Sequence, residues 1–376
     1  MKMRRILSCL SLITAVGASA GAQVVSYQTA PDHNSFIDRT ISPTMTPESS
    51  LSDLPAHHGW IVVNTDALFY GAAQTLNAWD LTQKTTKVLI GDPGLRKVQM
   101  AGGSGRDVAW LGSVGSGGRF SRLKTFDSTH LGIWSVDLST ASLPILAIPT
   151  VSNGSVYLGA DREVLSYAVD TGTLLWRRDI QAPVFDTVSF SSGMILAFSQ
   201  TGVSALRASD GQQIWSQQAS GLGMADYSRV VVTDGSIVCH TTADGRLAAL
   251  ELETGKALWS TPMGSRIDER HPPIVGPAGI MVPLISRLAF IDRAGKLLWE
   301  RRYEFLASKA SSPGFLMMRD TLLVAGADGL YALSLTDGNV MWKSAESSEV
   351  DGLLHKGGKI YASFRDGVLR IYPTGI

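Results

Sequence analysis

The chain has 376 residues, which is enough for two average domains or for one large all-β domain with a sizeable core. Hydrophobic residues make up 44% and charged residues 18%, with 38 glycines, so the composition excludes a disordered protein and favours a folded, turn-rich one. Lys and Arg balance Asp and Glu at 33 each, so no excess charge predicts binding to nucleic acid or to anionic lipid.

Residues 1–22 predict an export signal. The basic start MKMRR is followed by the apolar stretch ILSCLSLITAV and the small residues GASAGA, and the mature chain is expected to begin near Gly21 or Gln23. The apolar stretch is too short to span a bilayer, and no other segment of the sequence approaches that length. Cys9 lies inside this stretch, which leaves lipid attachment as an alternative. The prediction is an exported protein without a transmembrane segment.

Residues 23–58 follow as a polar arm rich in Ser, Thr and Pro, and most of it is expected to be irregular. Beyond the signal, Cys239 is alone, so neither an intramolecular disulfide nor a cysteine metal cluster is expected. The remaining residues, 59–376, form the predicted main domain.

This main domain is built from an internal repeat, best seen in LELETGKALW, residues 250–259. Copies that end on tryptophan recur in steps of 39 to 44 residues, and a degenerate copy with Val88 in the tryptophan position lies 46 residues before the first of them. This period suits a four-stranded propeller blade and is too long for ankyrin or leucine-rich repeats. The repeated tryptophans are Trp134, Trp176, Trp215, Trp259, Trp299 and Trp342.

Each repeat contains short β-rich runs separated by glycine turns, such as GSVYLGA from Gly154 and RLAALEL from Arg246. In five copies a glycine stands four residues before the tryptophan, where a tight turn between the third and fourth strands requires a positive φ. The tryptophan is expected on the outer strand, packed on the neighbouring blade with its indole N–H on a carbonyl. The five glycines are Gly172, Gly211, Gly255, Gly295 and Gly338.

The pattern A-x-x-x-x-TG-x-x-x-W resembles the tryptophan-docking repeat of the pyrroloquinoline-quinone-like β-propellers. Over residues 60–376 the chain is most similar to the BamB family, whose members are accessory factors of outer-membrane β-barrel assembly. This resemblance implies an all-β, eight-bladed propeller of four-stranded blades. The last copy ends before its tryptophan position, so a strand from the N-terminal arm, around Ile37 to Thr46, is expected to complete the last blade and close the ring.

Propellers with this repeat also occur in quinone-dependent periplasmic dehydrogenases, so an enzyme is the first alternative. Those relatives hold the quinone under a disulfide between adjacent cysteines and bind calcium through acidic residues. The present chain has no such cysteine pair and no D-x-D-x-D-G calcium loop. No catalytic residue, cofactor or metal site is therefore predicted.

Other catalytic patterns are weaker. His57 and His58 lie in the polar arm, and three further histidines, at positions 240, 271 and 355, fall in different repeats without metal-ligand spacing. The glycine-rich stretches AGGSGRD (101–107) and GSVGSGG (112–118) lack the Lys-Ser/Thr and the following helix of a phosphate loop, and they are read as loops flanking a strand of the second blade.

Protein binding is the preferred function, because loops on a rigid propeller are suited to recognition. In the BamB family, loops between blades dock the periplasmic domains of the barrel-assembly protein; by blade counting the corresponding loops here are residues 178–186 and 265–273. The second shares an Ile-Asp-x-Arg fragment with the family but continues with His-Pro-Pro at 271–273 instead of acidic residues. The candidate partner-binding residues are Arg266, Asp268, Glu269 and Arg270.

The resulting prediction is a non-enzymatic scaffold that acts as a monomer within a complex, in the periplasm or at the outer membrane. Its expected partner is an envelope protein, in particular a component of barrel assembly. A propeller that binds a different envelope partner, such as a polysaccharide or a secreted protein, is the second alternative, and the sequence does not separate it from the first.

Overall fold

The protein was analysed as a computed structural model, which describes residues 23–25, 37–41, 45–51, 62–64, 67–72, 75–80, 83, 85–91, 95–103, 106–113, 120–127, 131–138, 149–184, 188–199, 201–218, 232–241, 245–268, 271–307, 314–356 and 358–375. The predicted signal, residues 1–22, and the histidines at 57 and 58 lie outside these residues. In the described part no helix is long and apolar enough to cross a membrane.

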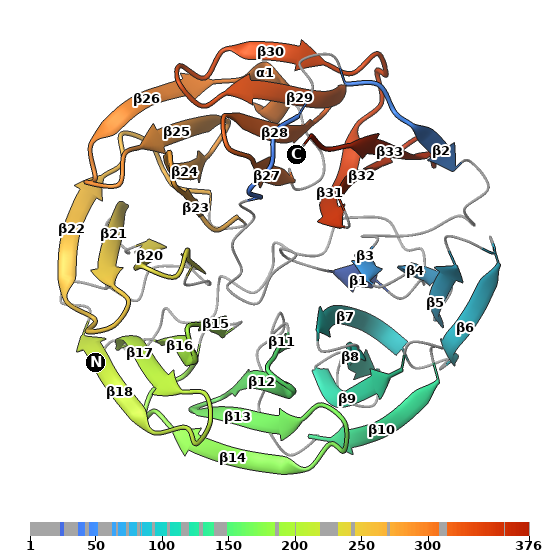
Figure 1. The fold of residues 1–376 in the computed structure, drawn as a ribbon, viewed down its shortest axis with the longest axis vertical. Helices are drawn as coiled ribbons and strands as arrows, with labels where there is room; N and C mark the ends of the chain where they lie inside the picture. The colour runs from blue at the N-terminus through green and yellow to red at the C-terminus, as the bar shows by residue number, and fades with distance from the viewer. Residues whose placement is uncertain are drawn as a thin grey trace, which may run out of the picture.

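The described strands form eight sheets that stand around a common centre (Figure 1). Their strands pair antiparallel except for one parallel pair that involves residues 23–25, and from residue 62 onward the chain visits the sheets in order. Each complete sheet runs from a short inner strand to an outer strand at the rim, which is the arrangement of a β-propeller. Strands of two to nine residues with β-branched and aromatic side chains, separated by glycine turns, explain why the sequence adopts this fold.

The first three complete sheets contain these strands. One consists of β3 (Val62–Asn64), β4 (Ala67–Ala72), β5 (Thr75–Asp80) and β6 (Thr86–Gly91). The next consists of β7 (Leu95–Gly103), β8 (Arg106–Ser113), β9 (Phe120–Phe126) and β10 (Gly132–Asp137), with β1 (Gln23–Val25) pairing in parallel on β7. The third consists of β11 (Thr150–Ser152), β12 (Ser155–Ala160), β13 (Glu163–Ala168) and β14 (Leu174–Asp179).

Four further sheets repeat this order. They are β15 (Ser189–Ser191), β16 (Met194–Ser199), β17 (Gly202–Arg207) and β18 (Gln213–Gln218); then β19 (Val232–Thr233), β20 (Ile237–Thr241), β21 (Arg246–Glu251) and β22 (Ala257–Pro262). After them come β23 (Ile274–Gly276), β24 (Gly279–Leu284), β25 (Arg287–Ile291) and β26 (Leu297–Arg302); then β27 (Phe315–Met317), β28 (Thr321–Gly326), β29 (Gly329–Ser334) and β30 (Val340–Lys343).

The last sheet joins the two ends of the chain. Its strands are β31 (Val350–Lys356), β32 (Lys359–Phe364) and β33 (Leu369–Pro373), and its outer position is occupied by β2 (Ser49–Leu51), which pairs antiparallel with β33. We call this sheet the closing sheet. The strand that pairs there therefore begins at Ser49, later than the expected segment around Ile37 to Thr46.

The segment around Ile37 to Thr46 has another role, which explains why the pairing strand begins later in the chain. Ile37 and Met45 are buried, at 7% and 5% exposed, in the core between the closing sheet and the β27–β30 sheet. Apolar residues in the arm thus anchor it to the core, while the outer strand is Ser49–Leu51, in which Ser49 and Ser50 are exposed. We call residues 37–41 and 45–51 together the strap.

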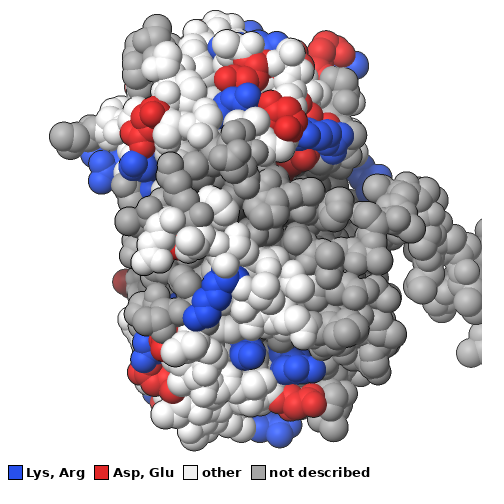
Figure 2. Space-filling model, turned by 90° about the vertical axis from the view of Figure 1, so that its right-hand side faces the viewer, with Lys and Arg blue, Asp and Glu red and all other residues white. Residues whose placement is uncertain are grey.

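The hydrophobic core is divided into clusters that lie between neighbouring sheets. One cluster joins Val156 and Leu165 to Val108 of the preceding sheet, and another joins Cys239 and Ala249 to Val282 of the following sheet. The side of the molecule over the closing sheet and β4–β6 carries Lys and Arg interspersed with Asp and Glu on its described residues, without a field of one sign (Figure 2).

Helical structure is limited, in the described residues, to one short segment, α1 (Glu304–Ala307). It connects β26 to the next sheet, and the carbonyl of Tyr303 accepts the amides of Leu306 and Ala307. The glycine-rich stretch 101–107 belongs to the β7–β8 hairpin, where Gly103 pairs with Arg106, so it does not precede a helix as a phosphate loop does.

Candidate protein-interaction faces

The repeated tryptophans form equivalent contacts between neighbouring sheets. In five of them the indole N–H donates to a backbone carbonyl of the next sheet, at 2.7 to 2.9 Å. Each ring is thus fixed at a position where only one orientation satisfies the N–H. The pairs are Trp134 to Val169, Trp176 to Ala208, Trp215 to Leu252, Trp259 to Arg293 and Trp299 to Leu335.

The repeated glycines contribute in two ways to the contacts between neighbouring sheets, and the sequence predicted one of them. All five have a positive φ, between 69° and 89°, in the turn before the outer strand. In addition, each lies against the tryptophan of the preceding sheet: a Cβ on Gly255 would stand 2.5 Å from the Trp215 ring, and one on Gly172 would stand 2.7 Å from Trp134. Backbone conformation and close approach therefore both require glycine at these positions.

The contact at Trp342 is different. Its ring lies edge-on to Tyr372, with centroids 6.2 Å apart, and it packs on the cluster that contains Ile37 and Met45. Among the described residues its indole N–H has no carbonyl partner of the kind that the other five have. The closing sheet is therefore joined to its neighbour mainly by apolar contacts and by the strap.

Two faces of the ring can be distinguished by their turns. On the hairpin face lie the turns that join inner strands to second strands and third strands to outer strands; on the connection face lie the turns between second and third strands. The segments that lead from an outer strand to the next sheet also lie on the connection face, because Val184 N–H bonds to the Asp161 carbonyl and Ile285 N–H to the Arg266 carbonyl.

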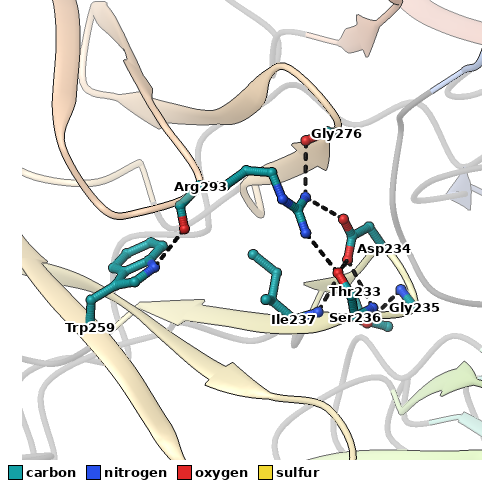
Figure 3. A network of polar contacts seen from close by, with 8 residues as sticks. All are labelled: Thr233, Asp234, Gly235, Ser236, Ile237, Trp259, Gly276 and Arg293. Carbon is teal, nitrogen blue, oxygen red and sulfur yellow. Dashed lines mark hydrogen bonds and ion pairs between the residues drawn. The ribbon is translucent and has the colours of Figure 1, made fainter.

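The hairpin face carries a polar network that joins two sheets (Figure 3). The Arg293 guanidinium, from the β25–β26 turn, forms an ion pair with Asp234 in the β19–β20 turn of the preceding sheet. It also donates to Ser236 Oγ at 2.7 Å and to the Gly276 carbonyl at 3.1 Å, while the Arg293 carbonyl accepts the Trp259 indole. We call this group the Arg293 clamp.

Asp234 in the clamp remains charged although it is largely enclosed. Burial by itself raises the pKa of the Asp234 carboxyl, but hydrogen bonds from Arg293, from the Ser236 hydroxyl and from the amides of Ser236 and Ile237 outweigh burial, and the pKa lies below its ordinary value. A second pair on this face, Arg106 with Asp170 at 2.9 Å, joins the corresponding turns of two other neighbouring sheets with the charges exchanged.

The predicted partner loops lie on the connection face. Val184 and Ile267 occupy equivalent positions, each bridging to the end of the second strand of the sheet that follows, at Ser199 and Leu284. Both side chains are buried, which fixes these loops to the propeller.

The candidate residues of the second loop do not all reach the surface. Arg266 is exposed, whereas Asp268 is 6% exposed, so its carboxylate is not accessible to a partner. Glu269 and Arg270 lie outside the described residues. The structure therefore narrows the described candidates in this loop to Arg266.

Next to Arg266 lies an exposed apolar residue that the sequence analysis did not single out. Ile285 is 48% exposed at the β24–β25 turn, and it is followed by Ser286 with a φ of 58°. Equivalent turns carry Asp161 or Ala327, so the isoleucine in a two-residue turn was a signal in the sequence. The turn is held on both sides, because Ile285 N–H bonds to the Arg266 carbonyl and Tyr303 N–H bonds to the Ser286 carbonyl. A rigid, exposed aliphatic side chain beside an arginine is suited to protein recognition.

No group of three or more His, Cys, Asp or Glu side chains in the described part of the chain could hold a metal ion. The histidines at 240, 271 and 355 lie in separate sheets or connections, and Cys239 is fully buried. Burial holds the pKa of the Cys239 thiol far above its usual range.

Comparison with known proteins identifies the family of the chain. The sequence profile of the family described as outer membrane protein assembly factor BamB matches residues 119–271 and 286–373, which is more than half of the chain. The BamB of Burkholderia pseudomallei is 24% identical over 267 residues, covering 62% of this chain and 68% of the relative. The matched part spans 58% to 68% of the length of four BamB relatives.

Solved structures agree in fold. The crystal structure of BamB from Moraxella catarrhalis superposes with a TM-score of 0.63 at 17% identity, covering 88% of this chain and 98% of that one. A quinohemoprotein alcohol dehydrogenase from Pseudomonas putida superposes with a TM-score of 0.63 at 14% identity, covering 92% of this chain and 79% of the enzyme. At these identities the likeness concerns the fold alone, and the fold is shared by binding proteins and enzymes.

Proposed function

The chain belongs to the family of the outer membrane protein assembly factor BamB, and from this premise we propose that it is an exported, non-enzymatic β-propeller scaffold for outer-membrane protein assembly. The proposal includes eight blades, a ring closed by the strap, and a place in the periplasm or at the outer membrane. The single observation that carries the binding role is the exposed Ile285 beside Arg266 on the connection face.

Ile285 is proposed as the central contact because its turn is rigid and its neighbours are polar. Arg287, which begins the following strand, is bound to Glu300 at 3.1 Å, and Glu304 is exposed at the start of α1. An exposed aliphatic residue beside an exposed arginine, with charged residues in the adjoining strand and helix, resembles the apolar centre and polar rim of a protein interface. The partner is therefore proposed to be an envelope protein that covers Ile285 and contacts Arg266.

A pull-down from an envelope extract tests the proposal with the full chain as bait. Wild type is expected to retain a barrel-assembly protein, and Ile285→Asp is expected to weaken retention roughly tenfold or more, because a charge in the centre of an interface is poorly tolerated. Val88→Asp is the matched control, since Val88 is 57% exposed on an outer strand and is not expected to affect binding.

The outcomes separate the parts of the proposal. If wild type retains no barrel-assembly component, the assembly role is wrong, and retention of another envelope partner would identify the alternative. If Ile285→Asp binds like wild type, the surface is wrong but the role stands. Binding of pyrroloquinoline quinone with calcium, or dye-linked alcohol oxidation, would favour the enzyme alternative instead.

A further inference from the structure

The strap is attached at several points to the closing sheet and to the neighbouring β27–β30 sheet. Its Ile37 N–H donates to the Met317 carbonyl at 2.8 Å, and Thr40 O accepts the Gly375 N–H at 2.8 Å. Nearer its end, Glu48 N–H donates to the Ile371 carbonyl, and Glu48 is paired with Lys359 at 2.5 Å. The outer strand itself, β2, contributes only three residues. The strap is therefore held by a few specific contacts and not by a long strand with a docked tryptophan.

A histidine lies in the same sheet beneath these contacts. His355 on β31 is the cross-strand partner of Ile360, and Ile360 is also the partner of Tyr372 on β33. Directly opposed residues point to the same side of a sheet, so His355 belongs to the row whose other members, Ile360 and Tyr372, are fully buried in the core with Ile37. Within the described residues, His355 Nε2 is buried and has no hydrogen-bond partner.

The charges around His355 oppose its protonation. Burial lowers the pKa of His355, and the positive charges of Arg39 on the strap and Lys356 on the same strand lower it further. The nearby carboxylates are already paired: Glu48 with Lys359, and Asp38 with Arg319 at 2.6 Å. Arg39 itself is held by the Gly375 carbonyl at 3.5 Å. A proton on His355 would thus add a third cation with no free acceptor among these groups.

We propose that His355 is an acid-sensitive switch for the strap, so that its protonation releases the strap from the closing sheet and from the β27–β30 sheet. In the neutral form the imidazole is accommodated under the strap. In the charged form, repulsion from Arg39 and the lack of an acceptor favour a state in which the strap has left and water reaches the ring. Release uncovers the edge of β33, Leu369–Pro373, which can then pair with another strand.

The direction of the pH effect follows from linkage. Because burial and the charge of Arg39 on the bound strap lower the pKa of His355 in the folded state, acid shifts the equilibrium toward the released state. The shift begins as the pH falls below the ordinary histidine value of about 6.5, and it grows until the pH passes the lowered value. Each unit of pKa difference between the two states corresponds to roughly a tenfold change in the released population.

Hydrogen exchange on the full chain tests this proposal, with each rate divided by the intrinsic rate at the same pH. From pH 7.5 to pH 5, wild type is expected to lose roughly tenfold in protection in residues 37–51 and 369–375, while β17 stays protected. His355→Leu is expected to keep the strap protected at pH 5. Arg39→Gln removes the repelling cation and is expected to reduce the loss of strap protection at pH 5. This variant provides the test if His355→Leu folds poorly.

His240→Leu is the matched control, because His240 is a 6% exposed histidine on β20, away from the closing sheet, with its ring 5.8 Å from that of Phe198. This variant should respond to pH as wild type does. Unchanged strap protection in wild type at pH 5 would overturn the proposal. A response of His355→Leu equal to that of wild type would also overturn it. If His355→Leu does not fold, a response of Arg39→Gln equal to that of wild type would overturn it instead. A loss of protection of equal size in every sheet would also overturn it, since it would indicate general acid unfolding.

Discussion

The five interfaces with a hydrogen-bonded tryptophan differ from the interface of the closing sheet. In the former, a glycine of the next sheet lies on the ring and a carbonyl accepts the indole N–H. In the latter, Trp342 packs on Tyr372 and on buried strap residues without such a bond in the described structure. Local repetition thus stabilises the ring at most positions, and a contact between distant parts of the chain replaces it at one.

The largest expected difference concerns the tryptophans themselves. Trp215→Ala should reduce the free energy of unfolding by about 3–5 kcal/mol, because a 9% exposed ring and its hydrogen bond are both lost. Trp342→Ala should cost about 2 kcal/mol, since the ring is only half-buried. Urea unfolding measures both; equal losses would contradict the distinction between the two kinds of interface.

The glycines sharpen the same comparison. Gly255→Ala should destabilise the fold by roughly 3 kcal/mol, because the methyl group adds a positive φ penalty to a clash with Trp215. Gly367→Ala in the closing sheet has a similar φ, 85°, but no atom within 4 Å, so it should cost only about 1 kcal/mol. Urea unfolding measures the loss of stability in each variant, and the difference between the two losses gives the contribution of the clash with the tryptophan ring alone.

The ion pairs of the two regions should differ less in their contribution to the free energy of unfolding. A double-mutant cycle with Asp234→Asn and Arg293→Met should give a coupling free energy of about 2 kcal/mol, because the pair is partly enclosed and shares further hydrogen bonds. The same cycle at Asp38 and Arg319, whose side chains are 72% and 50% exposed, should give no measurable coupling. A larger coupling in the strap would mean that ionic contacts dominate there.

The smallest expected effect is that of low pH on the contribution of Asp234, in the Arg293 clamp, to the stability of the fold. Since the pKa of Asp234 is lowered in the folded state, its contribution is fully present above the unfolded value of about 3.9. It is lost as the pH falls through the folded value. The stability difference between wild type and Asp234→Asn should therefore be constant from pH 7 to about 5 and shrink below about 4. A difference that shrinks already near pH 6 would point to another group.

The sequence predicted much of the fold because its signals are local and repeated. Strand runs such as GSVYLGA and the turn glycine before each tryptophan correspond to observed strands and positive φ values. The contact of Gly255 with Trp215 was not predicted, because it joins two copies of the repeat and no local pattern encodes it. Similarly, the incomplete last repeat predicted a strand from the arm around Ile37 to Thr46. In the structure Ile37 is buried in the core, and the strand that pairs is Ser49–Leu51.

The candidate site was harder to predict for the same reason. Arg266 is exposed, but Asp268 in the same loop is buried, and its burial depends on how that loop packs on the next sheet. Ile285 becomes significant only when its turn is seen beside Arg266.

The two polar pairs of the hairpin face also specify which blades can be neighbours. Arg106 meets Asp170 from the following sheet, whereas Asp234 meets Arg293, so the charges occupy equivalent turns in opposite order. If the repeats assembled out of order, with the Asp234 sheet before the Asp170 sheet, two carboxylates would face each other. Placing the Arg106 sheet before the Arg293 sheet would oppose two guanidinium groups. These two junctions of a chain of similar repeats are thereby distinguished by charge, which disfavours their exchange during folding.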